Sequence, residues 1–446
     1  MFKFLWVAIS LLLAVSGLKA QEVRKISFRE AVKIASESNI QLKRERNQLV
    51  SLEAEKLQSK MAFLPSASLN MRTARQDGQQ FQLVEDGFEI KNVQSTRLSG
   101  GLNASLNLFD GFSRVHNRKV IEHNYAAQVK GVERTKQEII FQTAQQYLQI
   151  LLDQELLKIN ERAIENQEQL LQQIEGFVKE GIRAKADLFT QQAELRRFEL
   201  AAIESENQLE IDKATFAQIL QLDPFEKFEV IAVENISSIQ FNKNDGLASL
   251  FEIAVANRSD LQQMELRLSS SRRNIASSKS SYYPSLSAFY EYGTQYSTLN
   301  SLSFQEQFFE LYPSNTIGLN LSIPLFNNYT NKTRVEVAKV QLSNSALDLE
   351  DIKRNIFLEI QNAYLNYEAS LKRIEVTKAG LHASQEAYEV QNQRYQMGAS
   401  SLIELSQANQ ILVQAESDYA QARFTLAFQK LIVEYNIGTL KLDDIN

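Results

Sequence analysis

Two patterns of apolar and polar residues alternate along the chain. In short segments every second residue is apolar, and in long segments apolar residues recur three and four positions apart. The first pattern is typical of a strand with one apolar and one polar face, and the second is typical of a helix that buries one face. The chain is therefore predicted to combine a few strands with long helices.

Strands are predicted at about 66–76 and 97–109, and again at about 285–296 and 315–326. In the clearest of these segments, leucine or isoleucine alternates with Ser, Asn or Gly. Each run is about long enough to cross a bilayer as a tilted strand, although a half-buried sheet in a soluble protein has the same pattern. Aromatic residues lie near the segment ends, as in the girdles of membrane barrels: Tyr290, Tyr292, Tyr296, Phe326 and Tyr329.

Long helices are predicted after each pair of strands. Residues 113–177 contain no proline, and at 1.5 Å per residue this run would span roughly 90–100 Å. A small globular core does not need a helix of that length. Its apolar residues follow the spacing of a coiled-coil seam, at Leu152, Leu156, Ile159, Ala163, Leu170, Ile174 and Phe177.

The chain also repeats itself. Gly181 and Gly398 lie 217 positions apart, and other matching residues keep almost the same spacing, including Tyr147 with Tyr364 and Pro65 with Pro284. Because fixed spacing over the whole length indicates a duplicated design, each half is predicted to run helix, strand, strand, helix, turn, helix. We divide the chain into a first repeat at 21–222, a connector at 223–246 and a second repeat at 247–446.

Gly181 and Gly398 interrupt helical patterns that are otherwise continuous. A chain that turns back at the end of a helix commonly places glycine there, because glycine adopts left-handed backbone geometry without strain. The two glycines therefore predict the tips of two helical hairpins, at the end away from the strands.

Composition narrows the classes of function. The first 20 residues have the pattern of a secretory signal that is cut after Ala20, and no later stretch is apolar enough for a membrane helix. Cysteine is absent, which excludes disulfides, thiolate metal sites and a cysteine nucleophile. The net charge is −6 and the basic residues form no cluster, so nucleic acid is not an expected partner.

No enzymatic site is expected. His116 and His123 are seven residues apart on one predicted helix, but no third metal ligand accompanies them, and His382 is the only other histidine. The sequence contains no nucleophile elbow, phosphate-binding loop or dinucleotide fingerprint. We therefore expect no catalytic residue, no cofactor and no metal.

The number of strands has a consequence for assembly. Four strands cannot close a barrel, and an open sheet edge is not tolerated in lipid. Because the smallest single-chain barrels have eight strands, several copies of this chain would have to share one barrel. Three copies would give twelve strands, but the sequence does not choose between two, three and four copies.

Taken in order, these features resemble the TolC-like outer-membrane efflux proteins over almost the whole chain after residue 20. The resemblance rests on the repeated halves, on the glycine tips and on the similar strand ends at 108–111 (Leu-Phe-Asp-Gly) and 325–328 (Leu-Phe-Asn-Asn). It implies a mainly α-helical fold with a membrane β-barrel contribution. Three copies would form a twelve-stranded barrel that continues into a long coiled-coil α-barrel in the periplasm.

The resemblance also implies a function. The protein would be the outer-membrane exit duct of a tripartite efflux or type I secretion system, in which a periplasmic adaptor links the duct to an inner-membrane pump. The duct itself would perform no chemistry, because the pump supplies the energy and selects the cargo, whether small molecules or proteins. A secreted or surface coiled-coil protein with a structural or adhesive role is the alternative.

Candidate roles for tip residues follow from the same resemblance. Acidic residues past the second tip glycine line a constriction in the family, which implies this role for Glu404, whereas Gln407 replaces a second acid. A tyrosine and an aspartate that latch the closed tips correspond to Tyr395 and Asp187, and the arginine of a second latch is replaced by Ser400. The tips also dock the adaptor, which implies a docking surface at Gly181, Ile182, Arg183, Gly398, Ala399 and Ser400.

Each gate residue also has a structural explanation. Tyr395 lies on the apolar stripe of its helix and can simply pack there. Asp187 and Glu404 lie near predicted helix N-termini, where acidic side chains are favoured by the helix dipole.

Overall fold

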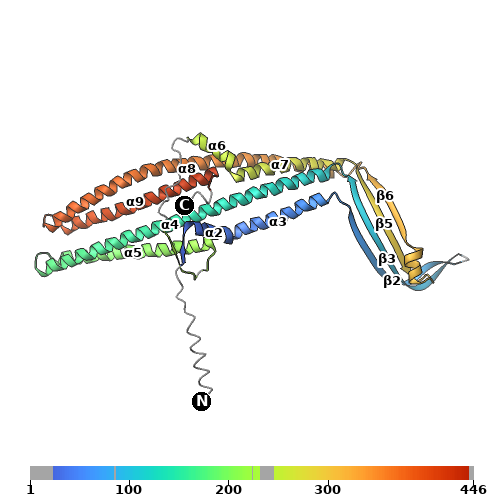
Figure 1. The fold of residues 1–446 in the computed structure, drawn as a ribbon, viewed down its shortest axis with the longest axis horizontal. Coiled ribbons are helices and arrows are strands. Elements are labelled where there is room, and N and C mark those ends of the chain that lie inside the picture. The colour runs from blue at the N-terminus through green and yellow to red at the C-terminus, as the bar shows by residue number, and fades with distance from the viewer. Residues whose placement is uncertain (1–23, 85–86, 224, 232–245, 441–446) are drawn as a thin grey trace, which may run out of the picture. The chain divides into compact units, whose positions relative to one another are not determined.

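A computed structural model describes residues 24–84, 87–223, 225–231 and 246–440 (Figure 1). The expected signal sequence and residues 232–245 of the connector lie outside this part of the chain. The described residues form two compact units. The hairpin unit contains residues 24–46, 131–261 and 352–440, and the sheet unit contains residues 47–130 and 262–351, apart from the gaps given above.

The two repeats of the sequence are not two spatial domains. Each repeat gives two strands to the sheet unit and a helical hairpin tip to the hairpin unit, and the boundaries between the units fall inside helices. Because the helices are long, one repeat extends into both units. The duplication therefore doubles the contents of each unit.

The sheet unit contains four antiparallel strands in the order β2-β3-β5-β6. Strands β2 and β3 are longer than expected because residues 77–84 continue to pair, with 87–94. Strand β6 ends at Ser322, before the predicted end, and Pro324 close behind it has no backbone N–H for pairing. The strands are β2 (Ser66–Val84), β3 (Gly87–Phe109), β5 (Ser285–Ser297) and β6 (Ser314–Ser322).

One face of this sheet is apolar. Leu102 is paired with Tyr292, and Tyr290 with Ile317, so their side chains share a face. The alternate positions, such as Asn103, give the opposite face its polar character. We call the first surface the apolar face. Its side chains differ in exposure in the single protomer, with Tyr290 37% exposed, Leu102 38% and Ile317 84%.

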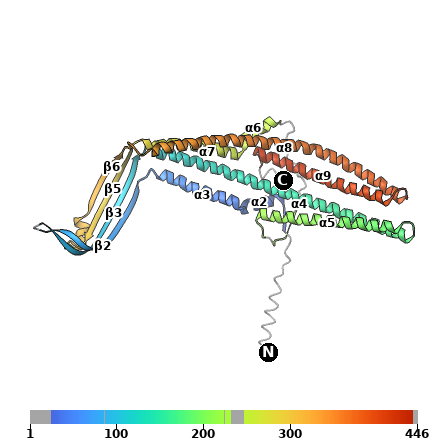
Figure 2. The same cartoon turned by 180° about the vertical axis from the view of Figure 1, so that it is seen from behind.

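Two helical hairpins dominate the rest of the fold, and in both views the two helices of each hairpin run side by side (Figures 1 and 2). None of the described helices is both long and apolar enough to cross a membrane. Matching helices have equal lengths, 67 residues for the longer pair and 36 for the shorter. The hairpins are α4 (Ser113–Lys179) with α5 (Lys185–Leu220), and α8 (Thr330–Gln396) with α9 (Leu402–Ile437).

The predicted coiled-coil seam of α4 packs against the second hairpin. Leu152 and Ile159 of α4 form a buried cluster with Ala420 of α9. Shorter elements complete the two units. They are β1 (Arg24–Ile26), α2 (Phe28–Ser38), α3 (Ile40–Met61), β4 (Phe228–Val230), α6 (Leu247–Asn257), α7 (Ser259–Lys279) and the single turns η1 (Ser280–Tyr282) and η2 (Glu306–Leu311).

An aromatic core holds the first repeat of the hairpin unit together. The Tyr147 ring lies 5.3 Å from that of Phe28 in α2 and 5.9 Å from that of Phe216 in α5. Its hydroxyl donates a hydrogen bond of 2.5 Å to the carbonyl of Ile231, next to the parallel β1–β4 pair. Tyr147 is thus a core residue. Its counterpart in the second repeat, Tyr364, instead has an exposed hydroxyl that is hydrogen-bonded to Glu368.

Candidate functional site: the tips of the helical hairpins

Both tips reverse the chain by the same backbone device. Gly181 and Gly398 have φ angles of 78° and 76°, and each follows the last turn of its long helix. The next N–H, of Ile182 or Ala399, reaches back 2.8 Å to a carbonyl five residues earlier. This is the Schellman arrangement, which satisfies carbonyls at a helix end. A Cβ at either glycine would meet no atom within 4 Å, so backbone geometry alone favours glycine here.

The helices that leave the two tips begin differently. At the start of α9, Ser401 Oγ accepts from Glu404 N at 3.3 Å, and Glu404 Oε2 accepts from Ser401 N at 3.1 Å. This reciprocal pair is a capping box. Gln391 Nε2 donates to the same Glu404 oxygen at 3.1 Å. The equivalent position in α5 is Ala184, which has no side-chain cap.

Tyr395 lies in the packed core of the tips. It is 1% exposed and clusters with Ile174 of α4 and with Leu402 and Leu405 of α9. The Arg183 guanidinium lies 4.7 Å from the centre of the tyrosine ring and also donates to the Tyr395 carbonyl at 3.4 Å. The first tip therefore supplies a cation to the face of an aromatic ring in the second hairpin.

The Tyr395 hydroxyl has no hydrogen-bond partner among the described residues, although it is buried. Burial raises the pKa of Tyr395, the charge of Arg183 lowers it, and the nearby charge of Asp187 raises it further. Asp187 is therefore close enough to interact electrostatically, but the two side chains are not hydrogen-bonded in this protomer. Their role as a latch stays a prediction.

The other predicted tip residues are distributed as follows. Ser400 is half-buried, and its hydroxyl has no partner within the described part of the chain. The others are exposed: Ile182, Gly398, Ala399 and Gln407. Glu404 is exposed but its carboxylate holds the start of α9. The spacing from Ser401 to Glu404 signals a capping box, which was not predicted from the sequence. Large exposed apolar side chains around the tips were not predicted either: Phe189, Met397 and Ile403.

A layer of buried polar side chains lies in the tip-proximal part of the hairpins. Gln191 of α5 is fully buried and donates to the side chain of Gln167 of α4 at 2.7 Å. Its own Oε1 has no donor, and the buried Asn409 Nδ2 of α9 has no acceptor, among the described residues. Buried polar groups are usually hydrogen-bonded, so this layer differs from a purely apolar seam.

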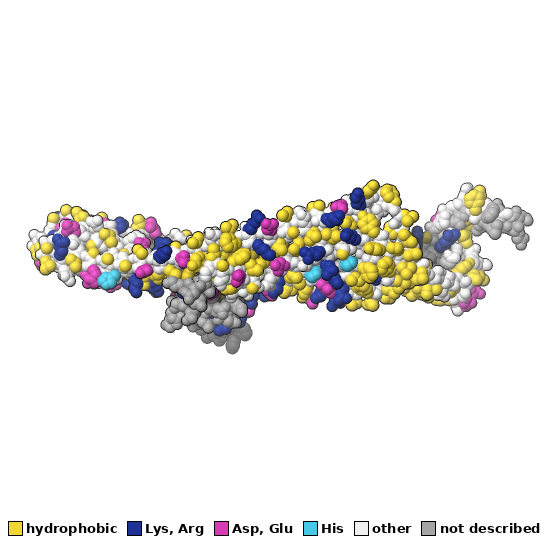
Figure 3. Space-filling model, turned by 90° about the horizontal axis from the view of Figure 1, so that it is seen from above, with side chains coloured by type: hydrophobic (Ala, Val, Ile, Leu, Met, Phe, Trp, Pro, Cys, Tyr) yellow, Lys and Arg dark blue, Asp and Glu magenta, His cyan; other side chains and the backbone are white. Residues whose placement is uncertain are grey.

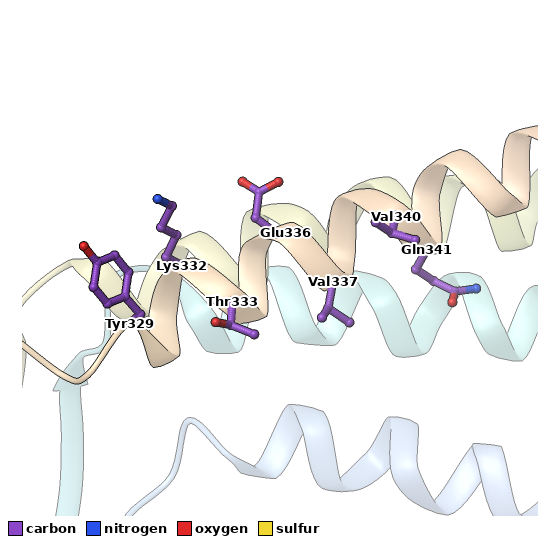
Figure 4. Close-up of a pocket in the computed structure, with 7 residues that line it drawn as sticks. All are labelled: Tyr329, Lys332, Thr333, Glu336, Val337, Val340 and Gln341. Carbon is purple, nitrogen blue, oxygen red and sulfur yellow. The ribbon is translucent and has the colours of Figure 1, made fainter.

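The sheet unit has an exposed groove along the first turns of α8. Figure 4 shows Lys332 and Glu336 projecting to one side of this helix and Val337 to the other. Val337 and Val340 are more than half exposed, and many other apolar side chains lie on this face of the protomer (Figure 3). The groove has a volume of about 520 Å³ and is lined by Tyr329, Lys332, Thr333, Glu336, Val337, Val340 and Gln341.

Comparison with known proteins agrees with this geometry. The family described as "Outer membrane efflux protein" matches residues 31–220 and 250–428. The chain is 21% identical to the outer membrane protein TolC of Salmonella enteritidis over 360 residues, which cover 80% of this chain and 72% of the relative. It is 26% identical to the cation efflux system protein CusC of Escherichia coli K12, over 72% of this chain and 68% of the relative.

Solved structures share the fold. A crystal structure of CusC superposes with a TM-score of 0.80 at 17% identity, covering 92% of both chains. The Campylobacter jejuni CmeC outer membrane channel gives a TM-score of 0.78 at 17% identity, covering 92% of this chain and 85% of the channel. The alternative of a secreted structural or adhesive protein is set aside by these matches. The chain belongs to the outer membrane efflux protein family, as an outer-membrane exit duct that extends into the periplasm.

Proposed function

We propose that three copies of this chain assemble into one duct, with twelve strands closing a barrel in the outer membrane and the hairpins forming a periplasmic tunnel. The observation that carries this proposal is the four-stranded sheet, whose edge strands β2 and β6 each have one neighbour only among the described strands. Pairing β6 of one copy with β2 of the next would remove both edges. The exposed apolar face would then lie against lipid, since barrels in the outer membrane carry an apolar band outside and polar residues inside.

Exposed apolar side chains on the helices support the same assembly. In the sheet unit, Val50 and Leu57 of α3 and Val337 and Val340 of α8 are all more than half exposed. Helix α3 leads into edge strand β2 and α8 follows edge strand β6. Pairing the two edges between copies would therefore bring α3 of one copy beside α8 of the next. The groove on α8 is then an intersubunit contact.

The assembly can be tested with cysteine pairs because the natural chain contains no cysteine. Single cysteines in β2 and β6, introduced together, should crosslink neighbouring copies under oxidation. The expected product series ends at three chains on a denaturing gel. A series that ends at two, or a single cysteine in β3 that crosslinks as well as those in the edge strands, would contradict the proposed barrel.

The tips are proposed to dock a periplasmic adaptor, which connects the duct to an inner-membrane pump. Support comes from Ile182, Met397 and Ile403, which are apolar and more than 60% exposed at the turns. They accompany the proposed docking residues Gly181, Arg183, Gly398, Ala399 and Ser400. The relatives include a cation efflux protein and a protease secretion protein, so the proposal leaves the choice of cargo to the pump.

The tips are also proposed to form the gate. The buried Tyr395 hydroxyl lacks a partner among the residues that the structure describes, and Asp187 lies close by, so a small movement could join them and stabilise the closed state. The Asp187→Ala and Tyr395→Phe double variant is expected to raise leak conductance in planar bilayers. Tyr388→Phe, on the same helix and against the same apolar cluster, is the matched control. Unchanged conductance in an intact trimer would contradict the latch.

Glu404 and Gln407 are proposed to line the constriction. Since three copies would bring three Glu404 carboxylates around one axis, they would attract cations. Glu404→Gln keeps a side-chain oxygen that can accept the capping hydrogen bond from Ser401 N, yet removes the charge. Reversal-potential measurements should show reduced cation selectivity with little change in stability, whereas loss of stability alone would assign Glu404 to capping only.

A further inference from the structure

An aromatic loop at residues 298–313 joins β5 to β6. Its rings form a continuous chain with Tyr296 at the end of β5: Phe304 lies 5.3 Å from Tyr296, Phe308 lies 5.0 Å from Phe304, and Phe309 lies 5.2 Å from Phe308. Part of the loop is the π-helical turn η2. Nothing in the duct proposed above requires such a cluster at this place.

Hydrogen bonds fix the loop in one conformation. Gln307 is fully buried, and its Oε1 accepts from Ser297 N at 3.0 Å. Its Nε2 donates to the Leu302 carbonyl at 2.6 Å. The Thr294 hydroxyl of β5 donates to the Phe308 carbonyl. A buried, fully engaged glutamine of this kind indicates a folded loop, because burying an amide without partners would cost free energy.

The loop lies on the apolar face of the sheet. Phe308 Cζ approaches within 3.1 Å of the position that a Cβ would take at Gly100. Gly100 is paired with Thr294, two positions along from the pair of Leu102 with Tyr292, so all four share the apolar face. The rings of the loop therefore pack on the apolar face of the sheet and not on its polar face.

The position of the loop matches one edge of an apolar band. Leu286 and Tyr296 lie ten residues apart on the apolar face, which is roughly 33 Å along a strand at 3.3 Å per residue. With the strand tilt of about 35–45° that barrels have, this is about 25 Å in height, the usual height of the lipid-facing band. The loop covers the Tyr296 end of that band.

The outer surface of the loop is apolar and its charge is negative. Phe309 is 62% exposed, and Leu311 and Phe304 are about half exposed. Residues 298–313 contain Glu306 and Glu310 but no Lys or Arg. An acidic loop of this kind does not attract lipid phosphates directly, whereas exposed Phe and Leu side chains at the edge of a lipid-facing band are stabilised by burial among acyl chains.

We propose that this loop anchors the duct at the lipid–water boundary of the outer leaflet, with Phe304, Phe309 and Leu311 in contact with acyl chains. The inference rests on the proposed function, because it requires the sheet to span the membrane. A bound lipid chain is thus the partner of the loop. The anchor fixes the height of the apolar face in the bilayer, since moving the rings into water would expose them.

Tryptophan fluorescence can test the anchor because Trp6 is the only tryptophan of the chain and lies in the expected signal sequence, which is cut off on export. In the exported protein, Phe309→Trp and Leu311→Trp each report on the loop. Leu319→Trp reports on the apolar face of β6, where Leu319 is 67% exposed. Phe225→Trp, at an 89% exposed position of the hairpin unit, is the aqueous control. The full-length trimers are reconstituted in phosphatidylcholine vesicles with and without bromine on the acyl chains.

The expected result is blue-shifted emission and strong quenching by brominated lipid for Phe309→Trp, Leu311→Trp and Leu319→Trp, with neither effect for Phe225→Trp. If only Leu319→Trp is quenched, the anchor is wrong although the sheet spans the membrane. If neither the loop nor the strand is quenched, the proposed barrel fails as well. Blue-shifted emission without quenching at Phe309→Trp would assign the loop to a protein contact and overturn the lipid anchor.

Discussion

Hairpins α4–α5 and α8–α9 have equal helix lengths and turn at glycines with nearly the same φ, yet their side chains secure the turns differently. The second tip caps its return helix with Ser401 and Glu404, whereas the first begins its return helix at Ala184 without a side-chain cap. In the first tip, the Arg183 guanidinium instead packs over the ring of Tyr395 in the second hairpin. The backbone plan is therefore common to both hairpins, whereas the stabilising contacts are individual.

The same contrast recurs where the helices of the hairpin unit begin and end. Asn39 lies between α2 and α3, and its side-chain oxygen accepts a hydrogen bond from Leu42 N. The corresponding residue between α6 and α7 is Arg258, which is buried and forms ion pairs. Helix α5 ends with Gln221 in left-handed geometry, and α9 ends with Gly438 in the same geometry. Equivalent backbone positions thus tolerate different side chains as long as each finds its own partners.

The largest expected effect concerns Arg258. It is 3% exposed and contacts Asp260 and Glu359, each at 2.5 Å. Arg258→Met would leave the Asp260 carboxylate partly unpaired, and breaking one side of a buried ion pair costs about 3–5 kcal/mol. Asn39→Ala at the equivalent junction should cost only about 1 kcal/mol, as for other helix caps. Urea unfolding in detergent micelles gives both values.

Removing the partner charge provides the control for this comparison. The Arg258→Met and Asp260→Asn double variant should recover part of the lost free energy of unfolding, because no buried carboxylate is then left without its cation. If Arg258→Met costs no more than Asn39→Ala, the two junctions are energetically equivalent and the ion network is not a stabilising feature of the second repeat.

The ends of the return helices should differ by a smaller amount. A Cβ at Gly438 would lie 3.0 Å from Arg258 N and 3.0 Å from Asn257 C, so Gly438→Gln adds crowding to left-handed strain. We expect a loss of roughly 2–4 kcal/mol. Gln221→Gly should change stability by less than about 1 kcal/mol, since reduced strain offsets the added freedom of the unfolded chain. Equal effects of the two substitutions would contradict the difference in packing.

A third contrast depends on pH. Asp153 of α4 is buried, and burial together with the neighbouring Asp212 of α5 raises its pKa to about 7. Burial by itself would raise the pKa of Asp212, but hydrogen bonds from Gln208, Gln146 and Asp153 lower it. The corresponding residues of the second hairpin are Ser370 and Gln429, which do not ionise.

The sign follows from proton binding. Between pH 3.8 and about pH 7 the Asp153 carboxyl is protonated in the folded chain and ionised in the unfolded chain. Because the folded chain then binds more protons, its stability falls as the pH rises through this range, and the contribution of Asp153 is lost at about pH 7. Asp153→Asn should therefore raise the free energy of unfolding at pH 8 by roughly 1–3 kcal/mol and less at pH 5. Ser370→Ala should show no such pH dependence. A pH-independent effect of Asp153→Asn would contradict the shared proton.

The smallest expected effect concerns the helix starts at the tips. Ser401→Ala removes the capping box of α9 and should lower the free energy of unfolding by about 1 kcal/mol. Ala184→Ser offers the first tip a cap that it lacks, and a gain of about 0.5–1 kcal/mol is expected. If Ala184→Ser instead destabilises the protein, the first tip requires an uncapped start for a reason that the protomer alone does not contain.

Local periodicity and backbone chemistry were enough to predict much of this protein. Alternation at 97–109, seam spacing from Leu152 to Ile174 and the fixed distance between Gly181 and Gly398 predicted strands, long helices and hairpin tips. The strands and helices depend on residues close together along the chain, and the repeat is a regularity of the sequence itself, so all three are visible before folding. The β-pairing of residues 77–84 with the start of β3 was missed because the sequence there is mostly polar and glycine-containing, and its apolar alternation is confined to Phe81, Leu83, Phe88 and Ile90.

Contacts between distant residues were decided only by the tertiary structure. The sequence identified Tyr395 but not the contact of its ring with Arg183. Neither Asp153 nor Asp212 was singled out, because nothing in the local pattern distinguishes them from other acids on helix faces. The aromatic loop was unremarked because its meaning depends on folding back over Gly100. Burial and partner choice arise when segments more than 200 residues apart pack together, and no pattern within one segment specifies them. The sequence by itself thus determined the repeated elements and their turns, whereas the tertiary structure decided which side chains share a core, a charge or a face.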